Sequence, residues 1–357
     1  MDATTTNSEI VDRSPVWIFS RNVDLAAFLG SALMSLVLLA FGWSQGLLHT
    51  SDVPEWTWVS GVLLVDVAHV YATVFRVYLL PTELTRRTWL YLLVPGLSVL
   101  LGWAIASESE SAFWRILAYI AVFHFVRQQV GWVAWYRRRG DDESSTSLLD
   151  YSAIYLATIY PLLYWHAHLP RNFWWFVDSD FLSLPVVMDQ LVFPLYVTVF
   201  ALYLLRIVRL YSRRRFRSLG KDCLVLTTAV CWYVGIVALN SDYAFTVTNV
   251  LIHGIPYMVL TFRYARSVGE PTWIRGSLLR AVLVFLATVW MLAYSEELLW
   301  NRGIWHEHLE LFGPAMEIGL DRPLLLAILA MPQVTHYILD GFIWRRGQLS
   351  ASFLRRT

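Results

Sequence analysis

The sequence predicts an all-α fold, a polytopic bundle of about ten transmembrane helices that forms a single domain over residues 1–357. Two compositional observations indicate this class. Hydrophobic residues make up 57% of the chain and charged residues only 15%, against roughly 25% charged residues in a typical soluble domain. The mean hydropathy is +0.49. A third observation is that apolar runs of about 20 residues, each long enough to cross a bilayer as a helix, recur along the whole chain.

The expected helices follow one another with short connections. A mixed-charge segment, residues 1–20, precedes the first apolar run, which is too long for a signal-peptide core and lacks a small-residue cleavage site. We therefore interpret that run as a retained span. A short polar tail, residues 346–357, follows the last run. By hydropathy the expected spans are 24–45, 56–80, 89–106, 113–136, 151–168, 186–211, 222–240, 242–265, 277–299 and 322–344.

Basic residues collect in every second connection. Arg137, Arg138 and Arg139 follow the fourth span, for example, and another basic cluster follows the sixth. The alternate connections are expected to hold acidic residues, including Glu110, Glu296 and Glu297, with few basic ones. By the positive-inside rule both termini are predicted to be cytoplasmic, and we expect the chain to reside in a bacterial cytoplasmic membrane. The net charge of +1 gives no reason to expect nucleic-acid binding.

Four histidines lie near the middle of four apolar runs. These are His69, His124, His253 and His336, in the second, fourth, eighth and tenth spans. The predicted topology makes these four spans run in the same direction, so the imidazoles fall at similar depth. Ionisable residues inside a membrane are expensive and usually functional. Because neutral imidazole is the commonest protein ligand for iron, copper or zinc, the pattern predicts an intramembrane metal site.

Each of these histidines has a polar neighbour three or four positions away, on the same helix face. Metal-binding histidines normally donate their second ring N–H to such a group. The spacing leaves open whether Asp66 and Asp340 bind the metal directly or hold the rings of His69 and His336. The candidates for the second role are Asp66, Gln128, Asn249 and Asp340.

Further residues near the predicted site could act on a substrate. Arg127 lies deeper than an arginine at a helix end, and we expect it to pair with Asp66 or Asp340. Tyr257 follows His253 by four positions. Pro256 and Pro332 should kink their helices beside the site. His166 and His168, with His306 and His308, could form an external metal site, although exposed interfacial histidines explain them more simply.

Two other functions suit the same residues. The same residues could instead form a polar network that fixes helix packing. They could also form a proton path, in which the four histidines, with Asp66, Asp340 and Arg127, would serve a proton-coupled transporter. Alternatively, two histidines on facing helices could ligate a haem in an electron-transfer bundle. We find no nucleotide-binding glycine loop, no H-E-x-x-H motif and no three-box desaturase pattern.

The strings FSRNVDLAAFLGS, FHFVRQQVGW and THYILDGFIWRR resemble signatures of an uncharacterised family of polytopic bacterial membrane proteins. That resemblance implies a membrane protein but no activity. More loosely, single histidines on several spans are similar to those of membrane-bound β-carotene dioxygenases. That resemblance implies a non-haem iron held by His69, His124, His253 and His336, and cleavage of a polyene.

Together these observations predict an integral-membrane metalloenzyme with an intramembrane histidine site. We expect iron as the metal, with zinc or copper as alternatives, and a non-haem iron oxidoreductase or oxygenase activity. The expected partners are membrane lipids and a lipophilic substrate, because such a substrate would reach a site at mid-membrane depth directly.

Overall fold

The computed structural model describes residues 15–50, 53–140, 146–268 and 276–345, together with Ile274, Gly347, Leu349 and Phe353. Within these ranges every regular element is a helix, so the all-α prediction is confirmed. Most of the expected flanking segments, 1–20 and 346–357, lies outside the described residues.

Among the described residues, eight helical stretches are long and apolar enough to cross a membrane, which indicates an integral membrane protein. They agree closely with eight of the expected spans. In chain order they are Arg21–Ser44 (α1, η1, α2), Glu55–Arg76 (α3, η3, α4), Thr88–Glu108 (α6), Val187–Ser212 (α9), Leu219–Ala238 (α10, η5), Asp242–Val268 (α11, η6, α12), Leu278–Trp305 (α13, η8) and Arg322–Ile343 (α15).

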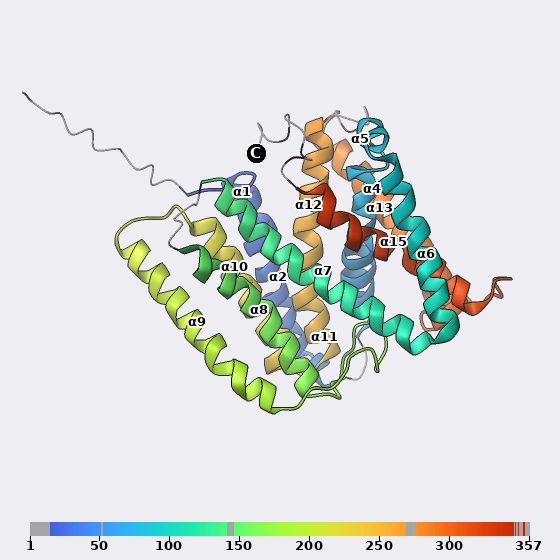
Figure 1. Cartoon of the computed structure of the whole chain (residues 1–357), viewed down its shortest axis with the longest axis horizontal. Helices are drawn as coiled ribbons and strands as arrows, with labels where there is room; N and C mark the ends of the chain where they lie inside the picture. Colours follow the sequence, from blue (N-terminus) through green and yellow to red (C-terminus); the bar gives the residue numbers. More distant parts are fainter. Residues whose placement is uncertain are drawn as a thin grey trace, which may run out of the picture.

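The other two expected spans are helices of sufficient length but lower hydrophobicity. These are α7 (Glu110–Arg138) and α8 (Ser147–Ala167). Helix α7 carries Arg115 and Arg127, and α8 carries Asp150 and four tyrosines. Figure 1 shows α7 crossing the bundle obliquely from the end of α6 toward the start of α10. The short helices α5 (Pro81–Arg86) and α14 (Leu309–Phe312) lie in connections.

Some helices start at a residue whose side chain accepts a free backbone amide, and α7 and α15 are two of them. The Ser109 hydroxyl accepts the Ala112 amide at 3.2 Å and caps α7. The Asp321 carboxylate accepts the Leu324 amide at 3.3 Å and caps α15, whose first turn contains a proline. Such caps satisfy amides that have no partner inside the helix. They therefore fix the start of the two helices that later supply His124 and His336.

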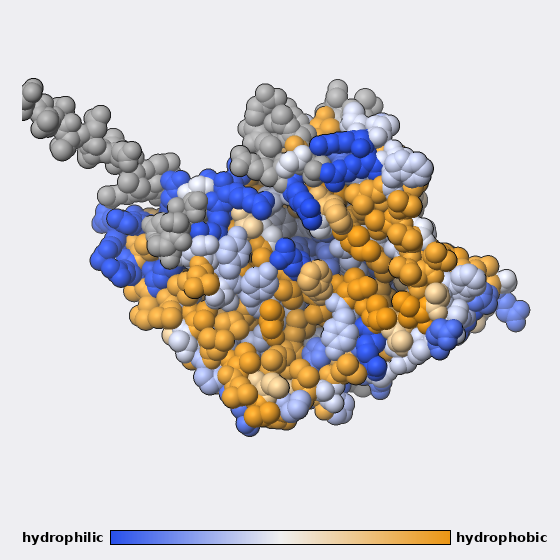
Figure 2. Space-filling model, in the orientation of Figure 1, coloured by the Kyte–Doolittle hydropathy of each residue, from blue (hydrophilic) through white to orange (hydrophobic). Residues whose placement is uncertain are grey.

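The described ends of the chain and the basic connections lie at one edge of the bundle, the upper edge in Figure 1. The Val16 amide donates to the Arg217 carbonyl, between α9 and α10, at 3.0 Å. Near the other end, the Arg86 guanidinium donates to the Gly347 carbonyl at 3.2 Å. Figure 2 shows hydrophilic residues gathered at this edge above a broad hydrophobic surface.

Apolar side chains face outward and polar groups lie inside. Leu101 on α6 and Leu205 on α9 are 57% and 65% exposed, whereas Asp150 and Lys221 are fully buried. A soluble protein would bury such leucines and expose such charges. The distribution fits a bundle surrounded by lipid.

A buried ionic cluster joins α7, α8, α9 and α10. Lys221 Nζ and Arg137 Nη1 donate to the same oxygen of Asp150, at 2.6 and 2.5 Å. Arg206 donates to Asp222 at 2.9 Å. Since each carboxylate has a cationic partner, the cluster compensates charges that would otherwise be very costly to bury.

One expectation about the connections was wrong. Glu296 and Glu297, expected in a polar connection, lie within α13 (Leu278–Trp300) and are only 4% and 8% exposed. The Glu296 carboxylate accepts hydrogen bonds from Trp300 Nε1 at 3.0 Å and from Gln333 at 3.3 Å. The hydropathy span 277–299 already contained both residues, but a window average over an apolar helix does not show whether two acids within it are buried.

Candidate metal centre

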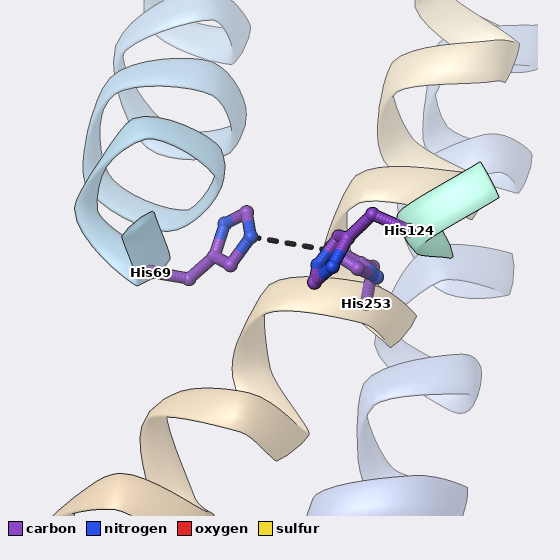
Figure 3. Close-up of side chains that lie close together, drawn as sticks. All are labelled: His69, His124 and His253. Carbon is purple, nitrogen blue, oxygen red and sulfur yellow. Dashed lines mark hydrogen bonds between the residues drawn. The ribbon is translucent and has the colours of Figure 1, made fainter. Parts of the chain in front are cut away.

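Four helices bring the four histidines to one buried place. His69 comes from α4 (Ala68–Arg76), His124 from α7, His253 from α12 (Leu251–Val268) and His336 from α15. All four side chains are at most 4% exposed. Figure 3 shows His69, His124 and His253 directed toward one another from three separate helices.

The backbone immediately before two of these histidines is π-helical. The segment η3 (Trp58–Val67) precedes His69, and η6 (Thr246–Val250) precedes His253. Wide π turns are rare and often occur at functional sites. A π turn changes the direction in which the following side chains point. Hydropathy and a regular 3.6-residue period therefore could not predict toward which neighbouring helix the rings of His69 and His253 point.

The Nε2 atoms of the rings face inward in pairs. His69 and His253 have their Nε2 atoms 3.1 Å apart, and those of His124 and His336 are 3.2 Å apart. One nitrogen from each of His69, His124 and His253 lies within 4.8 Å of the others, and His124, His336 and Asp340 form a second such group. An ion bound at about 2.0–2.1 Å needs its nitrogen ligands roughly 3–4 Å apart. Each group of three therefore has dimensions that suit an ion, and His124 belongs to both groups.

A glycine permits the close approach of the helices that carry His69 and His253. A Cβ atom built on Gly254 would lie 2.7 Å from Cγ1 of Val65 and 3.0 Å from its carbonyl oxygen. Any larger residue would thus collide with the backbone of η3. Gly254 sets the distance between the two helices and, through it, the distance between the two imidazoles.

The outward Nδ1 atoms of three rings face acceptor groups. Nδ1 of His336 lies 2.7 Å from the Thr73 hydroxyl. Nδ1 of His69 lies 3.6 Å from Asp66, and Nδ1 of His124 lies 3.8 Å from Asp340, which are ion-pair rather than hydrogen-bond distances. The His253 ring stacks on Phe125 with centroids 3.5 Å apart, and its Nδ1 has no partner among the described residues.

A hydrogen-bond chain defines the tautomer of His336. The Tyr257 hydroxyl donates to Asp340 Oδ1 at 2.6 Å, so its oxygen accepts from the Thr73 hydroxyl at 3.0 Å. Thr73 has then used its only proton and must accept from Nδ1–H of His336. Trp344 Nε1 also donates to Asp340 Oδ1, at 3.0 Å. The proton on Nδ1 leaves a lone pair on Nε2 of His336, directed at the cluster.

Four expected partners have other contacts. Asp340 was expected to hold the His336 ring, but it faces Nδ1 of His124 at 3.8 Å, and Thr73 contacts Nδ1 of His336 instead. Gln128 donates to the backbone carbonyl of His253 at 2.9 Å rather than to the His124 ring. Asn249 donates to Phe245 and Thr248 within its own helix. The expectation that Arg127 pairs with Asp66 or Asp340 was wrong, because Arg127 is exposed and donates to the Tyr155 hydroxyl at 2.9 Å. Sequence spacing placed each of these residues on a suitable turn. Gln128 and Arg127 donate to acceptors on neighbouring helices, whereas Asn249 donates within its own helix.

The other histidines do not join a metal-like group within the described ranges. His166 contacts the Leu162 carbonyl and the Tyr119 hydroxyl, at 2.6 and 3.0 Å. His168 lies 3.8 Å from Asp189, and the His308 ring contacts Trp58 in a tilted arrangement with centroids 3.9 Å apart. These partners explain His166, His168 and His308 as structural residues. His306 adopts a positive φ of 60° at the end of η8 (Asn301–Trp305).

A cavity of about 660 Å³ adjoins the histidines on one side. Helices α7, α12 and α15 line it, and His124, Tyr257 and Asp340 contribute to its wall. Arg127, predicted near the site, also lines this cavity. Sequence reasoning missed Thr73 and Phe125. Thr73 follows His69 by one helical turn, but its contact with His336 depends on the packing of α4 against α15.

The donor set fits a transition-metal ion: four neutral imidazoles, no thiolate, and outward nitrogens that mostly face oxygen acceptors. Comparison of the chain with protein-family models, curated proteins and solved structures gave no match.

Proposed function

We propose that this chain is an integral-membrane metalloenzyme that uses a histidine-bound transition metal, iron in the first instance, to oxidise a lipophilic substrate with dioxygen. Membrane lipid surrounds the site, so a substrate that partitions into the bilayer can reach it laterally. Single histidines on several spans are also similar to those of membrane-bound β-carotene dioxygenases, which would use the same chemistry.

The orientation of the imidazoles is the observation that carries the proposal. With an ion at the centre, the four Nε2 lone pairs point inward and the Nδ1–H groups point outward. The Nδ1–H of His336 then faces Thr73, that of His124 faces Asp340, and that of His69 faces Asp66. Without an ion, His124 would have to donate from Nε2 to His336. Its bare Nδ1 lone pair would then face the Asp340 carboxylate, which is electrostatically unfavourable. Metal binding resolves that conflict.

The residues have separate roles in this proposal. His69, His124, His253 and His336 hold the ion, which supplies a redox centre when bound. Asp66 and Asp340 orient rings, while Tyr257 and Thr73 hold the tautomer of His336. Arg127 lies in the adjoining cavity, where it can position a polar group of the substrate. Four imidazoles can also bind zinc or copper. Zinc has no redox chemistry and cannot oxidise a substrate, so iron is the proposed metal and copper is the alternative.

The same distances argue against a haem between His69 and His253 or between His124 and His336. A haem iron held by two axial imidazoles needs their Nε2 atoms about 4 Å apart, twice a metal–nitrogen bond of about 2.0 Å. The pairs at 3.1 and 3.2 Å are closer than this. A flat macrocycle would have to push the helices apart to enter.

We propose ten spans, with α7 and α8 as the fourth and fifth, and both termini in the cytoplasm of a bacterial cell. The support is the single basic edge that holds the described chain ends, since basic connections favour the cytoplasmic side.

The decisive measurement is the metal content of the protein purified from metal-replete cells. We expect about one equivalent of transition metal per chain, and each of His69→Ala, His124→Ala, His253→Ala and His336→Ala should lower it strongly. His49→Ala is the matched control, because His49 is exposed in a connection. Wild-type protein with less than a tenth of an equivalent would contradict the proposal.

One observation favours a proton-coupled transporter as the second candidate. Glu296 and Glu297 are buried, and the Glu296 contact Gln333 precedes His336 by one turn on α15. Buried acids beside histidines are typical of proton relays. Solute uptake by proteoliposomes that follows an imposed pH gradient, in protein free of metal, would favour transport over oxidation.

A further inference from the structure

The cavity beside the histidines has a charge gradient along its length. Its inner wall contains His124 and Asp340, and its outer wall contains Arg138 and Arg345. Along α7, 14 residues separate His124 from Arg138, which corresponds to about 21 Å at 1.5 Å per residue. Arg138 is the last residue of α7, and Arg345 lies just beyond α15, on the side of the basic edge. The cavity thus extends from the buried site toward the membrane surface.

The cationic groups of this cavity are not neutralised by acids. Among the described residues, no carboxylate forms an ion pair with Arg127, Arg138 or Arg345. The one acid in the wall, Asp340, already accepts from Tyr257 and Trp344. The outer end therefore carries positive charge that an anionic group can pair with.

Between its two ends the wall is largely aromatic and aliphatic. The indole rings of Trp135 and Trp344 lie near each other, with centroids 6.3 Å apart, and Leu260 adjoins them in the wall. Figure 2 shows a recess in the surface beside α7. The volume of about 660 Å³ lies within the range of roughly 300–1,000 Å³ found for small-molecule sites. An elongated apolar chain fits such a wall better than a compact polar ligand does.

We propose that this cavity binds a single-chain amphiphile with an anionic head, such as a long-chain carboxylate or an alkyl phosphate. The head pairs with Arg138 and Arg345, and the chain runs along Trp135 and Trp344 toward His124. This inference rests on the proposed function, because it assigns the substrate class of the same site. Such a ligand would place a carbon of its chain, rather than its head, beside the histidines.

The test is photo-crosslinking of the full chain in non-ionic detergent. Three long-chain compounds carry a diazirine at the end of the chain and differ only in their head: a carboxylate, a phosphate or a neutral alcohol. Labelled residues are located by mass spectrometry. We expect the anionic compounds, one or both, to label the inner wall around Phe123 and Tyr337, and the alcohol to label it weakly. Labelling by only one anion identifies the head.

Charge dependence separates this inference from simple partitioning into an apolar cavity. The double variant Arg138→Gln/Arg345→Gln should lower labelling by the anionic compounds about tenfold, as expected for lost charged hydrogen bonds. The double variant Arg209→Gln/Arg213→Gln, which changes exposed arginines around the end of α9, is the control and should label as wild type. Equal labelling by the alcohol, no labelling of the inner wall, or no effect of the first double variant overturns the inference.

Metal content measured on the same samples keeps the two proposals apart. Metal-loaded protein without labelling overturns the substrate class and leaves the oxidative function standing. Labelled protein that holds no metal supports the amphiphile site but contradicts the oxidative function.

Discussion

The hydroxyl oxygen of Thr73 lies 2.7 Å from Nδ1 of His336, although the two residues are 263 positions apart in the chain. Through Tyr257 this contact connects a ring at the candidate metal centre to Asp340. Partners of this kind, which do not touch the metal, commonly set the tautomer and basicity of the ligand.

Thr73→Val should weaken metal binding without abolishing it. The substitution keeps the shape but removes the acceptor for Nδ1–H of His336, and loss of such a partner typically lowers affinity about 10–100-fold. Metal retention during titration with a competing chelator measures the change. Thr73→Ser keeps the hydroxyl and should restore wild-type affinity. Identical chelator curves for wild type and Thr73→Val would show that the contact has no role in metal binding.

Gly254→Ala should both destabilise the protein and lower its metal content. The added Cβ meets Cγ1 and the carbonyl oxygen of Val65, and overpacking of this kind costs about 1–3 kcal/mol. The Val65 carbonyl oxygen is a backbone atom and cannot rotate away as a side chain can. We therefore expect α12 to move away from η3, which increases the distance between His253 and His69. The double variant Val65→Ala/Gly254→Ala removes only the side-chain clash and should recover part of the loss.

Gly96→Ala is the matched control for that experiment, since nothing lies within 4 Å of a Cβ at Gly96. Thermal unfolding in detergent and metal analysis are the two measurements. If Gly254→Ala and Gly96→Ala unfold at the same temperature with equal metal content, the close approach of the two helices is unimportant.

Lys221→Met should destabilise the fold while leaving the metal site intact. The substitution removes one of the three cations that pair with Asp150, and breaking a buried ion pair costs roughly 3–5 kcal/mol. Arg137 and Arg206 remain, so we expect the lower end of that range. Unfolding in a denaturing detergent measures the loss, and metal content per folded chain should not change. A parallel loss of metal would indicate coupling between the two clusters.

Glu110 and Arg322 should make a small, pH-dependent contribution to stability. Arg322 donates two hydrogen bonds to Glu110, both at 2.9 Å, and thereby holds the pKa of this carboxyl below its usual value of 4.5. A lowered pKa in the folded state stabilises the fold above pH 4.5 and ceases to do so as the pH falls through the lowered pKa.

Both side chains of that pair are 40% or more exposed, so the contribution should stay below about 1 kcal/mol. Glu110→Gln should therefore unfold slightly more readily than wild type at pH 7 and equally at low pH. Unfolding curves at the two pH values measure this, and a difference that grows on acidification would contradict the assignment.

The sequence by itself determined that the chain is helical, where its apolar helices lie and which four histidines come together. Hydropathy and charge alternation are local properties, and in lipid an unbroken run of about 20 apolar residues satisfies its backbone as a helix. Only the tertiary structure decided which polar groups meet. Thr73 reaches His336 because η3 and the close approach of Gly254 to Val65 set the rotation and distance of the helix that carries Thr73. Arg127 turns to Tyr155 because α8 packs beside α7, and Glu296 is buried where α13 meets Gln333 of α15. A pattern of residues along one helix does not contain that rotation.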